Sequence, residues 1–169
     1  MSFYRLQKPD CFYLSAAVGW LELGDWQEAN AELERVRPEL RGHGAVLAVR
    51  HDIYAKAQKW DMAGDVAEIL RKADPHNPHW WIASAYSTRR REGGGLRAAQ
   101  SILRDARERF PKEATIGYNL ACYSCQLGNT ADAQTFLKEA FSLGDAARMK
   151  LMALDDPDLE PLWANIGTI

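Results

Sequence analysis

Two cysteines of this chain have the spacing of a thiol redox pair. Cys122 and Cys125 form a C-x-x-C motif, which in thiol oxidoreductases lies at a helix N-terminus, where the helix dipole lowers the thiol pKa. Here the pair is expected in the middle of a helix. Two cysteines with no neighbouring histidine also fall short of the four ligands that a structural zinc site needs. We therefore interpret both as structural cysteines and keep thiol redox chemistry as a disfavoured alternative.

Two other segments contain residues that are common in metal or phosphate sites, but both are more simply interpreted as turns. Residues 76 to 79, His-Asn-Pro-His, carry two histidines, but proline with polar neighbours is typical of a turn. The glycine run at residues 93 to 95 follows no strand and lacks the lysine and hydroxyl of a phosphate-binding loop. No G-x-S-x-G motif of a hydrolase nucleophile is present. The sequence thus predicts no catalytic residue, no cofactor and no metal, and a protein that is not an enzyme.

The amino-acid composition excludes some classes of binding partner. The chain has 169 residues, of which 47% are hydrophobic and 26% charged, as in ordinary globular domains. A net charge of -2 and a pI near 6.1 argue against nucleic acid as a partner. No apolar run approaches the roughly 20 residues of a membrane-spanning helix, and Gln7, Lys8 and Pro9 interrupt any signal peptide at the start. The chain has three cysteines, the third being Cys11, and an odd number suits a reducing compartment better than a set of disulfides. We therefore expect a cytoplasmic protein with no membrane partner.

Small residues recur along the chain at nearly constant spacing. Ala29, Ala63, Ala99 and Ala133 are separated by steps of 34, 36 and 34 residues. Three columns that agree on spacing and residue size indicate an internal repeat, and alanine suits the points where two helices cross closely. The other two columns are Leu33, Ala67, Leu103 and Leu137, and Val36, Leu70, Ala106 and Ala140.

A fourth column locates an insertion. Ala17, His51, Ala85 and Ala121 are separated by steps of 34, 34 and 36 residues. Two extra residues therefore enter between Ala85 and Ala99, and the glycine run at 93 to 95 lies in that stretch. Because glycine runs break helices, we expect the insertion in a turn between two helices.

Each repeat is predicted to be a helical hairpin, which makes the fold class all-α. Gly24 and Gly128 favour tight turns within hairpins, and Pro75 and Pro111 end the helices before them. The first helices are expected at roughly 10–23, 44–58, 78–91 and 114–127, and the second helices at roughly 26–37, 61–73, 96–109 and 130–142. In one domain, an N-terminal extension (1–9) precedes four units at 10–43, 44–77, 78–113 and 114–145, and a C-terminal cap (146–169) follows.

The repeat resembles the tetratricopeptide repeat (TPR). Residues 20 to 26, Trp-Leu-Glu-Leu-Gly-Asp-Trp, with Ala29 carry the likeness in the first unit, and residues 118 to 121, Tyr-Asn-Leu-Ala, with Gly128 carry it in the fourth. It covers residues 10 to about 145 and is weaker in the middle, where Gln58 stands in place of a turn glycine. The resemblance implies a right-handed α-α superhelix, or solenoid, of four hairpins with C-terminal capping helices.

The C-terminal segment is similar to the closing unit of bacterial TPR chains. That pattern implies a short helix at about 146–154, followed by a helical turn that Asp156 caps and Pro157 begins. Apolar side chains of this segment are expected to cover the exposed edge of the fourth hairpin. They are Met149, Leu151, Met152, Leu154, Leu159, Leu162 and Trp163.

The resemblance also implies a concave groove lined by the first helices. The groove residues expected on it are Leu14, Ser15, Val18, Glu22, Asp52, Lys56, Tyr86, Arg89, Arg90, Tyr118, Asn119, Cys122 and Gln126. Aromatic surface beside charges of both signs suits an extended or helical peptide. A carboxylate clamp for a partner's C-terminus is rejected, because Leu14 and Val18 cannot serve it. Arg89, Arg90 and Arg91 either attract an acidic segment or form a solvated helix end.

Trp80 and Trp81 are further candidates for an interface. Adjacent helical residues point about 100° apart, so one is expected to pack between hairpins and the other to be partly exposed as an interface anchor. We predict a non-enzymatic module that binds a peptide or another protein. The alternatives are a homo-oligomer that self-associates through residues 1–6 or Trp80 and Trp81, and a secretion-type chaperone.

Overall fold

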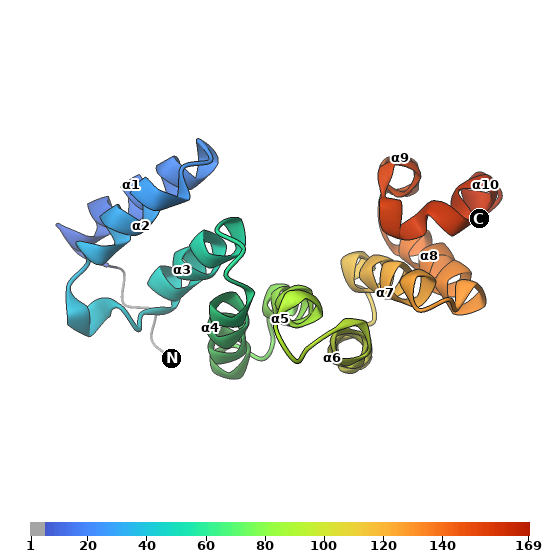
Figure 1. The fold of residues 1–169 in the computed structure, drawn as a ribbon, viewed down its shortest axis with the longest axis horizontal. Coiled ribbons are helices and arrows are strands. Elements are labelled where there is room, and N and C mark those ends of the chain that lie inside the picture. The colour runs from blue at the N-terminus through green and yellow to red at the C-terminus, as the bar shows by residue number, and fades with distance from the viewer. Residues whose placement is uncertain (1–5) are drawn as a thin grey trace. The chain divides into compact units, whose positions relative to one another are not determined.

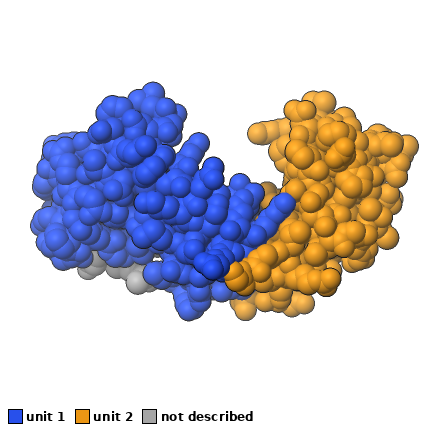
Figure 2. Space-filling view, in the orientation of Figure 1, with its two compact units in different colours: residues 1–92 blue, residues 93–169 orange. Residues whose placement is uncertain are grey.

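The computed structural model describes residues 6–169, and every element in that range is helical (Figure 1). The chain divides into two compact units, residues 1–92 (unit 1) and 93–169 (unit 2), shown in Figure 2. Unit 1 holds α1 (Asp10–Glu22), α2 (Trp26–Glu34), η1 (Pro38–Leu40), α3 (Gly44–Lys56), α4 (Trp60–Ala73) and α5 (Pro78–Arg90). Unit 2 holds α6 (Leu96–Arg109), α7 (Ala114–Gln126), α8 (Thr130–Leu143), α9 (Ala146–Asp155), η2 (Pro157–Leu162) and α10 (Trp163–Ile166).

The predicted helices are present, with one clear difference at the end of α2. This helix stops at Glu34, and the short 3-10 helix η1 follows, where the sequence predicts helix to residue 37. The cause is Pro38, since the residue before a proline avoids helical dihedral angles. Arg37 accordingly has φ -53° and ψ 139°.

Three hairpin turns share one hydrogen-bond pattern. Gly24 and Gly128 have φ of 86° and 81°, and Gln58, at the equivalent place in the second hairpin, has φ 56°. In each turn the following residue donates its N–H to a carbonyl five residues back, with N–O distances of 2.8–2.9 Å. This is the Schellman geometry of helix ends. The second hairpin keeps the turn although it lacks the glycine.

The insertion lies where the sequence places it. Residues 91–95 connect α5 to α6, whereas the other three hairpins use the three residues 23–25, 57–59 and 127–129. Gly93 and Gly95 have φ of 68° and 114° there, a region that favours glycine. The boundary between the two compact units falls in this same turn, a division that the repeat spacing does not predict.

The columns of small and apolar residues form the core. All residues of the three columns are at most 4% exposed, and the four alanines of the first are fully buried. In unit 1, Leu33, Val46 and Ile53 pack around Ala17 and Ala29. Close helix crossing at alanine therefore explains the repeat.

The C-terminal segment packs on the fourth hairpin differently from the expected cap. Asp156 accepts the Asp158 N–H at 3.0 Å and Pro157 begins η2, as predicted. Leu159 and Leu162 are buried, and η2 packs mainly on α7. The expectation that the whole set covers an apolar edge is wrong, because much of the surface of four members remains exposed. They are Leu151, Met152, Leu154 and Trp163.

Candidate protein-binding cleft

Unit 1 contains a cleft of about 520 Å³ between its first helices. Four helices contribute to its walls: α1, α3, α5 and the start of α4. The lining residues are Val18, Leu21, Glu22, Val49, Asp52, Ala55, Lys56, Trp60 and Tyr86. Five of them are predicted groove residues, namely Val18, Glu22, Asp52, Lys56 and Tyr86.

The helical repeat itself brings these side chains together. Val18, Asp52 and Tyr86 are 34 residues apart, so they occupy the same place on α1, α3 and α5. Glu22 and Lys56 stand one helical turn further along α1 and α3, on the same faces. The cleft is thus lined by two columns of the repeat, whose residue types vary while the core columns stay small or apolar.

An aromatic cluster forms one wall of the cleft. The rings of Trp60 and Tyr86 meet edge to face, with centroids 5.7 Å apart. The Arg90 guanidinium lies 3.5 Å from the Tyr86 ring centroid and 5.3 Å from that of Trp60, and it donates to the Tyr86 carbonyl oxygen at 3.0 Å. Tyr86 remains 42% exposed. The cluster holds this aromatic surface in place while leaving it open to a partner.

Two opposite charges of the cleft are available to a ligand. Among the described residues, neither Glu22 nor Lys56 has an ion-pair partner, and both side chains are exposed. Asp52 instead lies 3.0 Å from Nδ1 of the buried His51. The cleft therefore combines apolar and aromatic surface with one unpaired anion and one unpaired cation.

Other predicted residues of unit 1 lie outside this cleft. Leu14 packs partly buried against the core, and Ser15 is exposed on α1. The expected arginine cluster is partly used within the chain: Arg90 stacks on Tyr86, and Arg91 pairs with Asp65 at 3.3 Å. Arg89 is half-buried.

In unit 2 the predicted groove face is covered by the C-terminal segment. The Tyr118 hydroxyl donates to Asp156 Oδ2 at 3.1 Å, and the Cys122 thiol donates to the same oxygen at 3.4 Å. Gln126 donates to the Asp158 carbonyl at 3.1 Å. Tyr118 and Cys122 are buried, so their expected place on an open surface is wrong. The fourth residue, Asn119, donates to the Thr115 carbonyl of its own helix at 2.8 Å.

The same contacts bear on redox and metal chemistry. Burial raises the pKa of Cys125, with the Asp158 charge adding to the effect, and burial raises the pKa of Tyr118 well above its usual range. Ligand atoms of Cys122, Asp156 and Asp158 lie within 4.8 Å of one another. Three donors are fewer than a structural zinc site uses, and the Asp156 carboxylate already accepts three hydrogen bonds. The arrangement fits a structural hydrogen-bond cluster.

The two adjacent tryptophans divide as expected. Trp81 is buried, its indole N–H donates to the Pro75 carbonyl at 3.2 Å, and the Arg71 guanidinium stacks on its ring at 4.6 Å. Trp80 is half-buried and lines a second pocket of unit 1.

Sequence reasoning missed four lining residues of the cleft: Leu21, Val49, Ala55 and Trp60. The helical spacing could have found Leu21 and Ala55, which precede Glu22 and Lys56 by one residue. Trp60 begins α4, at the place that Trp26 has on α2. In the structure Trp60 is half-buried and contacts Tyr86.

Repeated hairpins, buried alanine columns and shared turn geometry define an all-α fold built of helical repeats. The solved structure of TTC0263, a thermophilic TPR protein of Thermus thermophilus, is similar with a TM-score of 0.67 and 20% identity, over 95% of this chain and all of that one. MamA MSR-1 C2 is similar with a TM-score of 0.65 and 19% identity, over 86% of this chain and 84% of that chain. The structure of a MamA RS-1 double mutant is similar with a TM-score of 0.70 and 15% identity, over 83% of this chain and 79% of that chain.

At these identities the likeness concerns the fold, which is TPR-like. No protein-family model and no curated protein sequence matches the chain. Within residues 6–169, the helices are too short or too polar to cross a membrane.

Proposed function

We propose that this chain is a protein-interaction module whose unit 1 binds a peptide segment of another protein in the cleft between α1, α3 and α5. The observation that carries the proposal is the cleft itself. It exposes Val18 and Tyr86, at 40% and 42%, together with the charges of Glu22 and Lys56, which have no ion-pair partner among residues 6–169. Exposed aromatic and aliphatic side chains bounded by charges are typical of peptide-binding surfaces.

The charges favour a ligand of mixed character. A segment that places an apolar side chain beside Val18 and Trp60 can also present a basic group to Glu22 and an acidic group to Lys56. Such pairs add specificity and orientation more than affinity. The TPR-like fold supports the same kind of function, because stacked hairpins present extended binding surfaces.

Panning a random peptide library on the purified full chain tests this proposal. The affinity of each enriched peptide is measured by fluorescence anisotropy for the native chain and for Val18→Glu. We expect the substitution to weaken binding by about tenfold or more, because it removes apolar contact and adds a third acidic group to the cleft.

Ile69→Glu is the matched control. Ile69 is 51% exposed on α4 and is not part of the cleft, so the same substitution there should leave the affinity unchanged. The proposal is wrong if no peptide is enriched, or if both variants weaken binding equally while keeping the native circular dichroism spectrum.

The alternative functions make different predictions. In self-association, sedimentation would show a dimer that dissociates on dilution. Residues 1–5 of the segment suggested for it lie outside the described residues, and Leu6 packs partly buried against the core of unit 1. A secretion-type chaperone remains a narrower form of the proposed function.

A further inference from the structure

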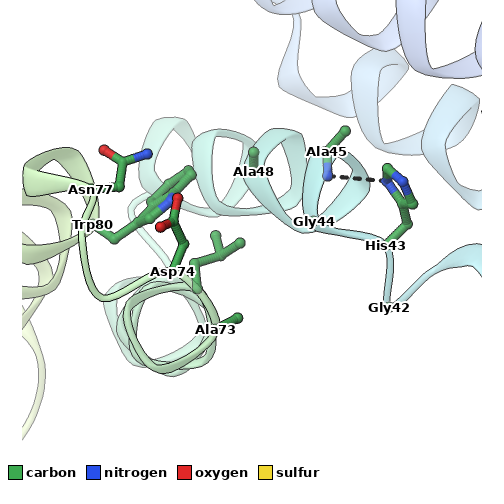
Figure 3. A pocket seen from close by; sticks show the side chains of 10 residues that line it. Gly42, His43, Gly44, Ala45, Ala48, Ala73, Asp74, Asn77 and Trp80 are labelled. Carbon is green, nitrogen blue, oxygen red and sulfur yellow. Dashed lines mark hydrogen bonds between the residues drawn. The ribbon is translucent and has the colours of Figure 1, made fainter. Parts of the chain in front are cut away.

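A second pocket of unit 1, of about 430 Å³, shares no lining residue with the peptide cleft. It lies where the connection before α3, the start of α3, the end of α4 and the start of α5 come together (Figure 3). The lining residues are Gly42, His43, Gly44, Ala45, Ala48, Leu70, Ala73, Asp74, Asn77 and Trp80. Nothing in the proposed function uses this pocket.

Small apolar residues form most of its wall. Ala45 and Ala48 stand one helical turn apart on α3, and Leu70 and Ala73 do the same on α4. Because the three alanine side chains are short, they leave room for an aliphatic stem from outside. Burying such a stem is favourable by about 0.8 kcal/mol for each methylene group.

One end of the pocket is negative. Asp74 ends α4, and its carboxylate has no hydrogen bond or ion pair with any described residue. The helix C-terminus adds partial negative charge at the same end. The two cations of the last turn of α4 are engaged elsewhere, since Arg71 stacks on Trp81 and Lys72 lies 2.7 Å from Glu68.

An indole lies at this negative end. Figure 3 shows Trp80 with Asp74 and Asn77 at one end of the pocket and His43 at the other. The Trp80 ring makes edge contacts with His79, at 4.5 Å between centroids, and with His51, at 6.3 Å, so its orientation is fixed. A carboxylate beside a tryptophan ring is a combination that binds organic cations.

We propose that this pocket binds the side chain of an arginine presented by a partner protein. The stem lies along the alanines of α3 and α4, and the guanidinium reaches the Asp74 carboxylate and the Trp80 ring. Arginine fits better than lysine, because its planar group stacks on an indole while donating two parallel hydrogen bonds to a carboxylate. This site is independent of the peptide cleft.

Two probes that differ in charge test the inference on the full chain. Nα-acetyl-L-arginine methylamide and its citrulline counterpart have nearly the same shape, but only the first is a cation. The measured signal is the indole N–H of Trp80 in nitrogen-15 NMR spectra, assigned from its loss in Trp80→Leu. We expect the arginine probe to shift this signal with a Kd in the roughly millimolar range, as for small fragments, and the citrulline probe to bind at least about fivefold more weakly.

Asp74→Asn removes the charge with almost no change in shape, so it should lower the affinity for the arginine probe to that for citrulline. The matched control is Asp105→Asn, which neutralises an exposed carboxylate of α6 and should change nothing. Equal binding of both probes, stronger binding of Nα-acetyl-L-glutamate methylamide, or no shift at all would overturn the proposal. If Asp74→Asn does not fold, the two probes on the native chain still decide it.

Discussion

At the residue scale, Asp10 shows how one buried charge joins the start of α1 to the chain after α2. Its side chain is fully buried, Oδ1 accepts the Arg37 backbone N–H at 2.9 Å, and Oδ2 accepts the Arg37 Nε–H at 2.8 Å. The backbone hydrogen bond from Arg37 is the main cause that lowers the pKa of Asp10 below its ordinary value. The folded state therefore favours the ionised carboxylate.

This shift predicts how stability depends on pH. The folded pKa lies below the unfolded value of about 3.8, so the stabilisation is complete above that value and is lost as pH falls through the lower, folded pKa. Urea denaturation between about pH 6 and pH 2 measures it. Asp10→Asn should be less stable at neutral pH and lose less stability in acid, whereas Asp105→Asn should follow the native curve. An unchanged acid slope in Asp10→Asn would contradict this role.

The cysteines allow a second prediction at this scale. Cys122 and Cys125 are 2% and 4% exposed, so a reagent cannot reach either thiol easily. Burial also raises the pKa of Cys125, so little of its reactive thiolate is present at neutral pH. Cys11 is partly exposed. With iodoacetamide, Cys11 should be alkylated first, and the other two only after addition of denaturant, as mass spectrometry of the digested chain can show. Rapid alkylation of the C-x-x-C pair in the folded chain would instead revive the redox alternative.

At the element scale, the hairpin turns offer a reciprocal experiment. Gln58 adopts φ 56° where the first and fourth hairpins have glycine, and a side chain in this region costs about 1–2 kcal/mol. Gln58→Gly should raise the free energy of unfolding by about 0.5–1 kcal/mol, less than the full strain because glycine also gains entropy in the unfolded chain. Gly24→Gln should lower it by a similar amount. Changes of the same sign in the two variants would show that this backbone geometry does not control the stability of the turn.

Most helices could be predicted from the sequence. Two helices that cross closely need small residues at the crossing point, and the repeated alanines, such as Ala29 and Ala63, show where those points lie along the chain. Gln58 shows one limit of such prediction. The turn at Gln58 has the same backbone hydrogen bonds as the turns at Gly24 and Gly128, but no glycine in the sequence marks it. The position of η2 illustrates another. Leu159 and Leu162 mark it as a buried segment, but whether it lies on α7 or on an edge depends on partners distant in sequence, such as Tyr118. The second pocket escaped prediction for the same reason, since Asp74 and Ala45 meet only through the packing of α3 and α4.

At the scale of the whole molecule, two surface columns of the repeat are open in unit 1 and covered in unit 2. The column of Val18, Asp52 and Tyr86 continues to Cys122, and the column of Glu22 and Lys56 continues through Arg90 to Gln126. In unit 1 these columns line the open cleft. In unit 2, Cys122 and Gln126 hydrogen-bond to the chain's own C-terminal segment. The fourth hairpin thus has its equivalent surface already occupied.

A bound ligand should therefore contact the first helices of unit 1 and leave α7 unchanged. Hydrogen–deuterium exchange with a peptide that binds the chain can test this distribution, because amides in helices that a ligand stabilises exchange more slowly. We expect slower exchange in α1, α3 and α5, and the same rate in α7 with and without peptide. Slower exchange in α7 together with faster exchange in residues 156–162 would mean that the ligand displaces the C-terminal segment. The segment would then be a competitor for a ligand-binding surface on α7.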